Sequence, residues 1–236
     1  MGQYSEVFCK VYNEFGWNYY PEAFGEQLLQ WIQETGLTVK TSMDLACGTG
    51  VLCEILHAQG IDAAGMDFSE GMIAIARQRN PEIPYDVADM TTYRPQKQFD
   101  LVTCTGDALN HIMALSDVEK IFHNVYAYLR EGGYFLFDLL KETEVGTEEP
   151  FDLPFSDTIQ ARFQMLRLED GTINLKTQVF EDGAFRFEEN IYETLHDPAE
   201  ICRLLKKAGF REILCRDRLL IGSQNASSTW YVIATK

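Results

Sequence analysis

The feature that most constrains the fold is the segment 43–50, MDLACGTG, in which a short apolar run ends in a glycine-rich turn. Such a turn lets the backbone approach a ligand closely, and the apolar residues after it predict a helix. A second apolar run, 61–66, ends in Asp67, seventeen residues beyond Gly50. A carboxylate in that place accepts hydrogen bonds from a ribose diol. Together the two segments predict a nucleoside-binding site at the carboxyl edge of a parallel sheet.

The turn departs from the pattern that binds a dinucleotide, G-x-G-x-x-G. Gly48 and Gly50 are present, but Cys53 stands in place of the third glycine. An acidic residue, Asp44, precedes the turn, where it would repel a pyrophosphate but would suit a ligand that carries an ammonium and a sulfonium. The sequence therefore disfavours a nicotinamide-dependent oxidoreductase.

Length, charge and cysteine content limit the class of protein. The 236 residues are enough for one large α/β domain, or for such a domain with a small appendage. A net charge of −16 disfavours a large surface for nucleic-acid phosphates, so nucleic acid is not the expected substrate. The six cysteines show neither a C-x-x-C pair nor a zinc spacing, which is typical of reduced thiols. We expect a cytoplasmic protein without a membrane span, either a monomer or a homodimer.

Strand and helix signals alternate along most of the chain, as in βαβ units that form a parallel sheet with helices on both faces. A capping box, Ser116 with Glu119, predicts the start of one of the helices. Seven strands are expected, at residues 41–46, 61–67, 85–88, 99–103, 134–139, 211–215 and 229–234.

A segment between the fifth strand and the last helix has a different period. Two Asp-Gly pairs, 170–171 and 182–183, each separate runs of residues with high strand propensity, which is a strong hairpin signal. The pattern predicts an antiparallel meander of three strands, at residues 158–168, 172–181 and 184–195.

Several motifs in a fixed order resemble those of the class I S-adenosylmethionine (SAM) dependent methyltransferases, including small-molecule N-methyltransferases that act on glycine and amino sugars. The resemblance covers nearly the whole chain and implies a Rossmann-like, seven-stranded, mostly parallel sheet. Its motifs are MDLACGTG at 43–50, GMDFSEGMIAIAR at 65–77, VADM at 87–90, FDLVTCTGDALNHI at 99–112 and LREGGYFLFDL at 129–139.

The resemblance also implies which residues bind SAM, and therefore its product S-adenosylhomocysteine. Asp67 would bind the ribose, Asp89 and Met90 the adenine, and Asp44 the methionine moiety, while the turn glycines admit the ligand. For Asp67 and Asp89, simple turn or helix-capping roles stay open. The full set of expected cofactor-binding residues is Asp44, Ala46, Gly48, Gly50, Asp67, Phe68, Met72, Asp89, Met90, Asp107 and Tyr19.

Candidate catalytic residues follow the fourth strand and lie in the aromatic N-terminal segment. Asp107, Asn110 and His111 should lie at the carboxyl edge, where open α/β sheets bind their ligands. An imidazole such as that of His111 can accept a proton from an amine or a hydroxyl, although a polar role at a helix start is the alternative. Tyr12 would contact the cofactor or the acceptor, or else pack in the core. We therefore predict His111, Tyr12 and Asn110 as catalytic and no metal.

The predicted function is transfer of a methyl group to a small-molecule acceptor, with an amine nitrogen favoured by the resemblance. O-methylation, an RNA or protein substrate, and a non-catalytic SAM-binding scaffold are the alternatives. Residues 103–106 lack the Asn/Asp-Pro-Pro-aromatic motif of nucleic-acid amino-methyltransferases. The expected division of the chain is a SAM-binding core at 1–140 and 197–236, with a helical cover at 1–36, and an antiparallel lid for the acceptor at 141–196.

Overall fold

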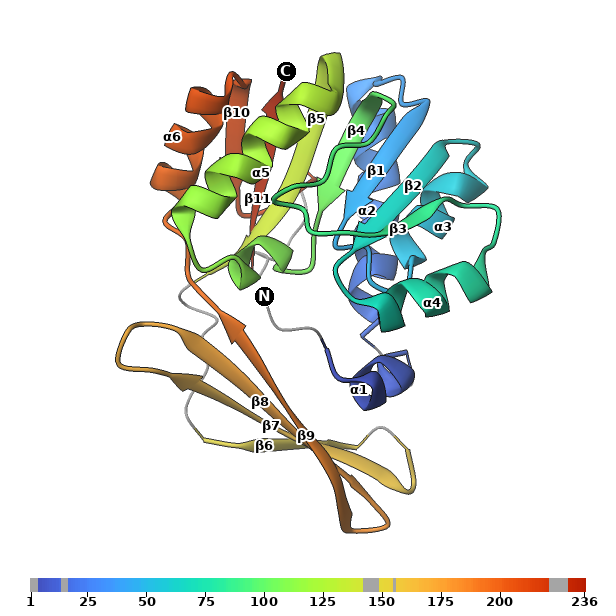
Figure 1. The fold of residues 1–236 in the computed structure, drawn as a ribbon, viewed down its shortest axis with the longest axis vertical. Coiled ribbons are helices and arrows are strands. Elements are labelled where there is room, and N and C mark those ends of the chain that lie inside the picture. Colours follow the sequence, from blue (N-terminus) through green and yellow to red (C-terminus); the bar gives the residue numbers. More distant parts are fainter. Residues whose placement is uncertain (1–3, 14–16, 142–148, 155, 221–228) are drawn as a thin grey trace.

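The computed structural model describes residues 4–13, 17–141, 149–154, 156–220 and 229–236. Residues 142–148 and 155 of the predicted lid, and residues 1–3 and 14–16 of the predicted helical cover, therefore lie outside the described part. Figure 1 shows two sheets, a larger one flanked by helices and a smaller one below it. The helices are α1 Glu6–Val11, α2 Tyr19–Thr35, α3 Val51–Ala58, α4 Glu70–Arg79, η1 Ala108–His111 (a 3₁₀ turn), α5 Leu115–Tyr128 and α6 Pro198–Ala208. The strands are β1 Thr41–Leu45, β2 Asp62–Asp67, β3 Tyr85–Val87, β4 Phe99–Cys104, β5 Leu129–Leu140, β6 Phe151–Pro154, β7 Ile159–Arg167, β8 Ile173–Glu181, β9 Ala184–Glu193, β10 Arg211–Arg216 and β11 Thr229–Thr235.

The larger sheet has seven strands in the order β10-β11-β5-β4-β1-β2-β3. The neighbours from β5 to β3 pair in parallel, whereas β11 runs antiparallel to both β5 and β10. The strand order reverses between β1 and β4, and open α/β sheets bind ligands at such a point. The predicted seven-stranded, mostly parallel, Rossmann-like sheet is confirmed.

Apolar side chains of the helices cover both faces of this sheet. Helices α5 and α6 pack with one face into one buried cluster, and α2, α3 and α4 contribute to a second cluster on the opposite face. On α5, Val118, Ile121, Phe122 and Val125 recur at helical spacing and are fully buried.

The start of α5 differs from the predicted capping box. The helix begins at Leu115, its N-cap is Ala114, and no side chain caps it. Ser116 therefore lies inside the first turn. The carboxylate of Glu119, which a capping box would need, instead forms an ion pair with Lys207 of α6 at 2.6 Å. Packing of α6 on α5 thus overrides the local signal, and the capping-box prediction is wrong.

The smaller sheet is antiparallel and has the order β6-β7-β8-β9. The three predicted strands correspond to β7, β8 and β9, and Gly171 and Gly183 adopt left-handed conformations in the two turns. The fourth strand, β6, was not predicted. All four of its residues are exposed and it ends in Pro154, so it carries no alternating apolar pattern and fits only at an edge.

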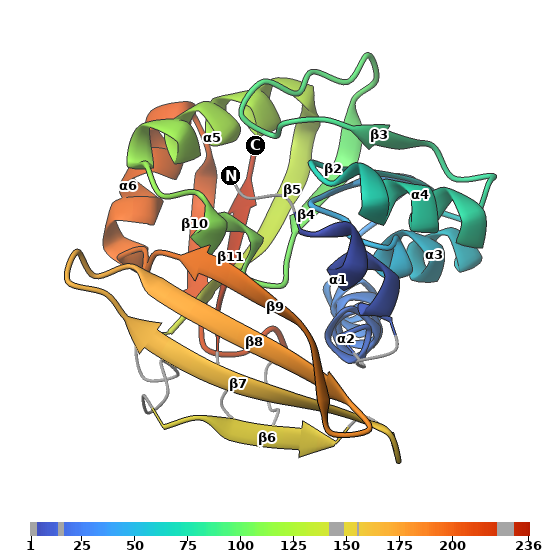
Figure 2. The ribbon, with the colours of Figure 1, turned by 60° about the horizontal axis from the view of Figure 1, so that its bottom comes forward.

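Helix α1 and the smaller sheet lie over the carboxyl edge of the larger sheet. Figure 2 shows α1 beside β9, with both in front of the sheet edge. Cys9 of α1 contacts the start of α4, where its sulfur lies 3.5 Å from the hydroxyl of Ser69. Ser5, the N-cap of α1, donates a hydrogen bond of 2.6 Å to Glu189 of β9. None of the described helices combines the length and apolar character needed to span a membrane.

Candidate active site

A cavity of about 500 Å³ opens where the carboxyl ends of β1, β2, β4 and β5 meet, with α1 and β9 forming the opposite wall. Its volume falls within the range of ~300–1,000 Å³ that is typical of small-molecule sites. The sheet side carries the glycine-rich turn and several carboxylates, and the opposite side carries aromatic rings from α1 and acidic side chains from β9. The site is thus built from segments far apart in the sequence.

The two glycines of the turn have different structural roles. Gly48 has a left-handed φ of +53°, and a Cβ built there would meet nothing within 4 Å, which leaves room on the cavity side. Gly50 also has a left-handed φ, of +82°, but a Cβ there would lie 2.5 Å from the hydroxyl oxygen of Tyr85 on β3. Gly48 therefore makes space for a ligand, whereas Gly50 makes space for the packing of β3.

Asp67 at the end of β2 combines a turn role with a place in the cavity wall. Its carboxylate accepts hydrogen bonds from the backbone N–H of Gly48 at 2.9 Å and of Ser69 at 2.8 Å. The side chain is buried, which raises its pKa, and it lines the cavity. Each carboxylate oxygen has a second lone pair, so the residue is able to bind a diol while it holds the turn.

Asp44 lies deeper in the same wall. Its carboxyl accepts a hydrogen bond of 2.7 Å from the hydroxyl of Thr103. Burial, together with the nearby carboxyls of Asp67 and Asp138, raises the pKa of Asp44 to about 7. A cationic group bound here would relieve that repulsion, so the donor set fits a ligand with an ammonium or a sulfonium.

Most of the expected cofactor-binding residues line the cavity, and three do not. Gly50 lies beside it. Asp89 forms a turn in which its carboxylate accepts from the N–H and the hydroxyl of Thr91, at 2.8 and 2.7 Å. Tyr19 is 76% exposed on α2, and the neighbouring Tyr20 lines the cavity instead. Asp89 and Tyr19 thus lie outside the cavity lining in which the expected cofactor contacts would be made. The expected residues found in the lining are Asp44, Ala46, Gly48, Asp67, Phe68, Met72, Met90 and Asp107.

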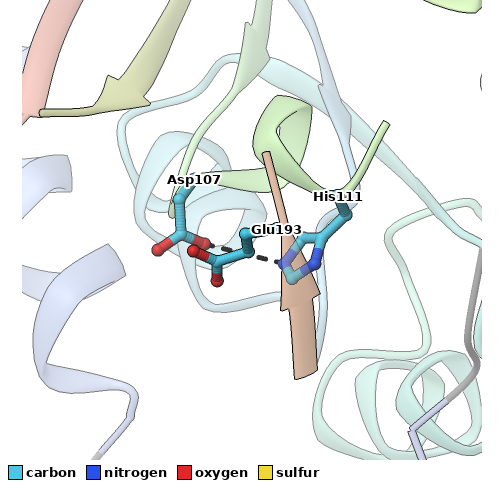
Figure 3. Close-up of side chains that lie close together, drawn as sticks. All are labelled: Asp107, His111 and Glu193. Atoms are coloured by element: carbon cyan, nitrogen blue, oxygen red, sulfur yellow. Dashed lines mark ion pairs between the residues drawn. The ribbon is translucent and has the colours of Figure 1, made fainter. Parts of the chain in front are cut away.

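Asp107, His111 and Glu193 converge in the cavity (Figure 3), and one ligand atom from each lies within 4.8 Å of the other two. Nε2 of His111 is 3.7 Å from a carboxylate oxygen of Asp107, and Nδ1 is 3.2 Å from the carbonyl oxygen of Tyr192. Burial and the charge of Asp138 together raise the pKa of Asp107 to about 8. Burial and the charge of Asp107 likewise raise the pKa of Glu193 to about 8.

Asn110 is fully buried outside the cavity, where it ties the smaller sheet to the larger one. Its side-chain amide donates to the carbonyl of Thr194 at 2.7 Å, and its amide oxygen accepts from the N–H of Leu140 at 3.0 Å. The backbone of Thr194 also donates to the carbonyl of Asn110 at 2.7 Å. Asn110 therefore positions the residues on either side of it, His111 on η1 and Glu193 on β9.

Aromatic side chains of the N-terminal segment form the wall that faces the sheet edge. The ring of Tyr12 lies 5.2 Å from that of Trp17, and the ring of Phe8 lies 4.6 Å from that of Trp17. Burial and the charges of Asp107 and Asp67 raise the pKa of Tyr12, so its hydroxyl stays protonated and is able to donate a hydrogen bond into the cavity.

The sequence analysis missed three acidic residues of the site, Asp138 on β5 and both Glu189 and Glu193 on β9. Asp138 on β5 accepts hydrogen bonds from the N–H groups of Gly106 and Asp107, and from the hydroxyl of Tyr20. Asp138 is a lone acidic residue within the apolar run of β5, and this pattern could have identified it as a candidate site residue. Glu193 had no such signal, because acidic residues recur along β9 and only the register of the strand distinguishes those that face the cavity.

Comparisons with known proteins connect this site to one family. Residues 43–133 match the model of a methyltransferase domain. The chain is 27% identical over 219 residues to a putative methyltransferase, YqeM, of Bacillus subtilis, and the alignment covers 86% of the chain and 85% of that relative. It is 26% identical over 130 residues to a dTDP-4-amino-2,3,4,6-tetradeoxy-D-glucose N,N-dimethyltransferase of Saccharopolyspora spinosa, covering 55% of the chain and 51% of that protein.

A solved S-adenosylmethionine-dependent methyltransferase from Clostridium acetobutylicum has the same fold. The two structures superpose with a TM-score of 0.82 at 23% sequence identity, over 95% of this chain and 98% of the other. The matched domain, residues 43–133, includes the glycine-rich turn, Asp67, Asp107 and His111, whereas the smaller sheet lies outside it.

Proposed function

We propose that this chain, a SAM-dependent methyltransferase, methylates an amine nitrogen of a small molecule that binds between the sheet edge and β9. The observation that carries the proposal is the charge of the cavity. Two relatives, from Saccharopolyspora spinosa and Streptomyces fradiae, are N,N-dimethyltransferases of amino sugars, which agrees with an amine acceptor.

The cavity wall is strongly acidic. The described lining contains one histidine and neither lysine nor arginine, and the residues outside the described ranges include neither of them. Buried carboxylates without cationic partners favour a ligand that brings positive charge. An amine, which is cationic near neutral pH, meets that requirement better than a phosphate or an acid does. The six acidic residues of the lining are Asp44, Asp67, Asp107, Asp138, Glu189 and Glu193.

The sheet side of the cavity fits the cofactor. Asp67 would hold the ribose and Asp44 the positively charged methionine end, while Gly48 leaves room for close approach. The apolar side chains of Met72 and Met90 would contact the adenine. When bound, SAM supplies an electrophilic methyl group.

The protein must expose the lone pair of the acceptor nitrogen, because an ammonium has none. The contact between Nδ1 of His111 and the carbonyl oxygen of Tyr192 requires a proton on Nδ1, which leaves Nε2 of a neutral ring free to accept one. Nε2 faces Asp107, whose carboxylate would stabilise the resulting imidazolium. His111 thus acts as the base, Asp107 orients it, and Tyr12 on the opposite wall closes the site against water.

Turnover with matched acceptors tests the proposal. Purified protein is incubated with SAM and a panel of small amines, each paired with the alcohol of the same skeleton, and mass spectrometry detects S-adenosylhomocysteine and the methylated product. We expect N-methyl products from the wild type and much slower formation with His111→Ala. Products methylated only on oxygen would make the chain an O-methyltransferase, and binding of SAM without consumption with any acceptor would favour a non-catalytic role.

A further inference from the structure

Strand β9 presents two acidic side chains to the cavity, Glu189 and Glu193. They are four residues apart on the same face of the strand, so their Cα atoms are separated by ~13 Å along it. The next residue to Glu189, Glu188, points to the opposite face, where it forms an ion pair of 3.0 Å with Lys176. Only two of the acidic residues near the end of β9 therefore belong to the cavity.

Glu193 is buried without a hydrogen-bond partner among the described residues. Its side chain is 5% exposed, and within the described part of the chain its carboxylate accepts no hydrogen bond and forms no ion pair. Its nearest titratable neighbours are Asp107, whose charge raises the pKa of Glu193, and His111, which lowers it. Ionisation of Glu193 is therefore unfavourable in the empty cavity, and a cationic ligand would favour the ionised form.

Glu189 marks a second position for a cation at the far end of the same wall. Its carboxylate accepts hydrogen bonds from the hydroxyl of Ser5 at 2.6 Å and from the N–H of Ser5 at 3.3 Å. Both donors are neutral, so the negative charge of Glu189 is held in place but not cancelled. The wall that faces the cofactor side thus has one carboxyl group at each end, Glu189 and Glu193.

We propose that the acceptor is a diamine or a longer polyamine. Its reacting nitrogen lies beside Glu193, Asp107 and His111, and its second ammonium lies beside Glu189. The inference rests on the proposed N-methylation and names the class of its substrate. A four-carbon diamine with a charge-assisted hydrogen bond of about 2.8 Å at each end spans a distance similar to the ~13 Å between the Cα atoms of Glu189 and Glu193.

This substrate class differs from the nucleotide-linked amino sugars named for two of the relatives. A nucleoside diphosphate carries negative charge and needs cationic or backbone N–H donors. The six acidic residues of the lining would repel it. In the proposed reaction the reacting nitrogen gives a proton to His111 and forms the new bond to the methyl carbon, S-adenosylhomocysteine leaves, and the second ammonium is unchanged.

Three four-carbon ligands test whether a second ammonium contributes to binding. Putrescine has two amines, n-butylamine has one, and γ-aminobutyrate has an amine and a carboxylate. Their binding to the protein loaded with S-adenosylhomocysteine is measured by calorimetry, and kcat/KM is measured with SAM. We expect putrescine to be favoured over n-butylamine by about tenfold or more, the effect of one further charge-assisted hydrogen bond. γ-Aminobutyrate should bind more weakly than n-butylamine.

Variants of β9 locate the second charge. Glu189→Gln should abolish the preference for putrescine, whereas Glu188→Gln, which removes an acid from the outer face of the same strand, should keep it. Ser5→Ala removes the hydroxyl hydrogen bond to Glu189 but neither the backbone one nor the carboxylate itself, and should also keep the preference. This variant separates the electrostatic role of Glu189 from its role in docking α1.

The outcomes distinguish this inference from the proposed function. Equal N-methylation of putrescine and n-butylamine would overturn the polyamine inference and leave N-methylation standing. A preference for γ-aminobutyrate, or a preference for putrescine that survives Glu189→Gln, would also overturn it. Tight binding of Mn²⁺ that displaces putrescine and is lost in Glu193→Gln would make the cluster a metal site instead. Methylation restricted to alcohols would overturn both proposals.

Discussion

Asp67→Ala should weaken both the fold and cofactor binding, and the structure gives the size of each effect. The Asp67 carboxylate accepts two backbone hydrogen bonds, from Gly48 at 2.9 Å and Ser69 at 2.8 Å. A hydrogen bond to a charged group contributes about 1.5–3 kcal/mol, so the loss of both should lower the free energy of unfolding by ~3 kcal/mol or more. Loss of the expected bonds to the ribose should lower SAM affinity by about 2 kcal/mol, which is roughly 30-fold.

Denaturant unfolding of the ligand-free protein measures the first effect, and calorimetric titration with SAM well below the midpoint of unfolding measures the second. Asp89→Ala is the matched control, since it removes an acid whose two hydrogen bonds, both to Thr91, also hold a turn but lie outside the cavity. The control should lose some stability and keep its SAM affinity. Unchanged affinity in Asp67→Ala, or an equal loss of affinity in Asp89→Ala, would refute this assignment of the two acids.

Further predictions concern pH, catalysis and the junction between the sheets. The pKa values of Asp44 and Glu193 are raised, to about 7 and about 8, so the stability linked to these groups is present at low pH and lost as they ionise. The melting temperature of the ligand-free protein should fall as the pH rises from about 4, where these carboxyls ionise in the unfolded chain, to about 8, and Glu193→Gln should flatten this fall. His111→Ala should lower kcat by ~10²–10⁴-fold, and Tyr12→Phe should lower kcat less. In both variants the loss of SAM affinity, measured by calorimetry, should be smaller than the loss of kcat, measured by steady-state kinetics. Asn110→Ala should reduce the free energy of unfolding by ~2–4 kcal/mol and raise KM for the acceptor, because it removes the hydrogen bonds that connect the end of β9 to β5. An unchanged KM would show that Asn110 does not position the acceptor site.

Much of the fold follows from local sequence patterns, and the exceptions have identifiable causes. Short apolar runs alternate with helical periods, and each of the seven expected strands of the larger sheet is present. The capping box at Ser116 failed because Glu119 pairs with a lysine on another helix, which no local pattern reveals. Strand β6 was missed because an exposed edge strand of four residues needs no apolar alternation.

The cofactor side of the site was easier to predict than the acceptor side. The motifs place Gly48 on the turn that follows β1 and Asp67 at the end of β2, so the positions of both depend on a few neighbouring residues. Tyr20 rather than Tyr19 faces the cavity because of the rotation of α2, a choice that one residue of helical phase decides. The position of Glu193 depends on the register of β9 and on the hydrogen bonds by which Asn110 holds the end of that strand, and both are long-range features.

The contact between α1 and β9 also affects the order in which the molecule can be completed. Ser5 and Glu189 are 184 residues apart, and Trp17 also contacts a residue far along the chain, Phe163 of the smaller sheet. During synthesis the aromatic side chains of the N-terminal segment emerge early, yet the strands that cover them emerge only near the end of translation. Until then these rings have no native partner on the smaller sheet, and closing so long a loop slows their burial. The glycine-rich turn is thus made early in synthesis, but the pocket around it is among the last parts of the molecule to form.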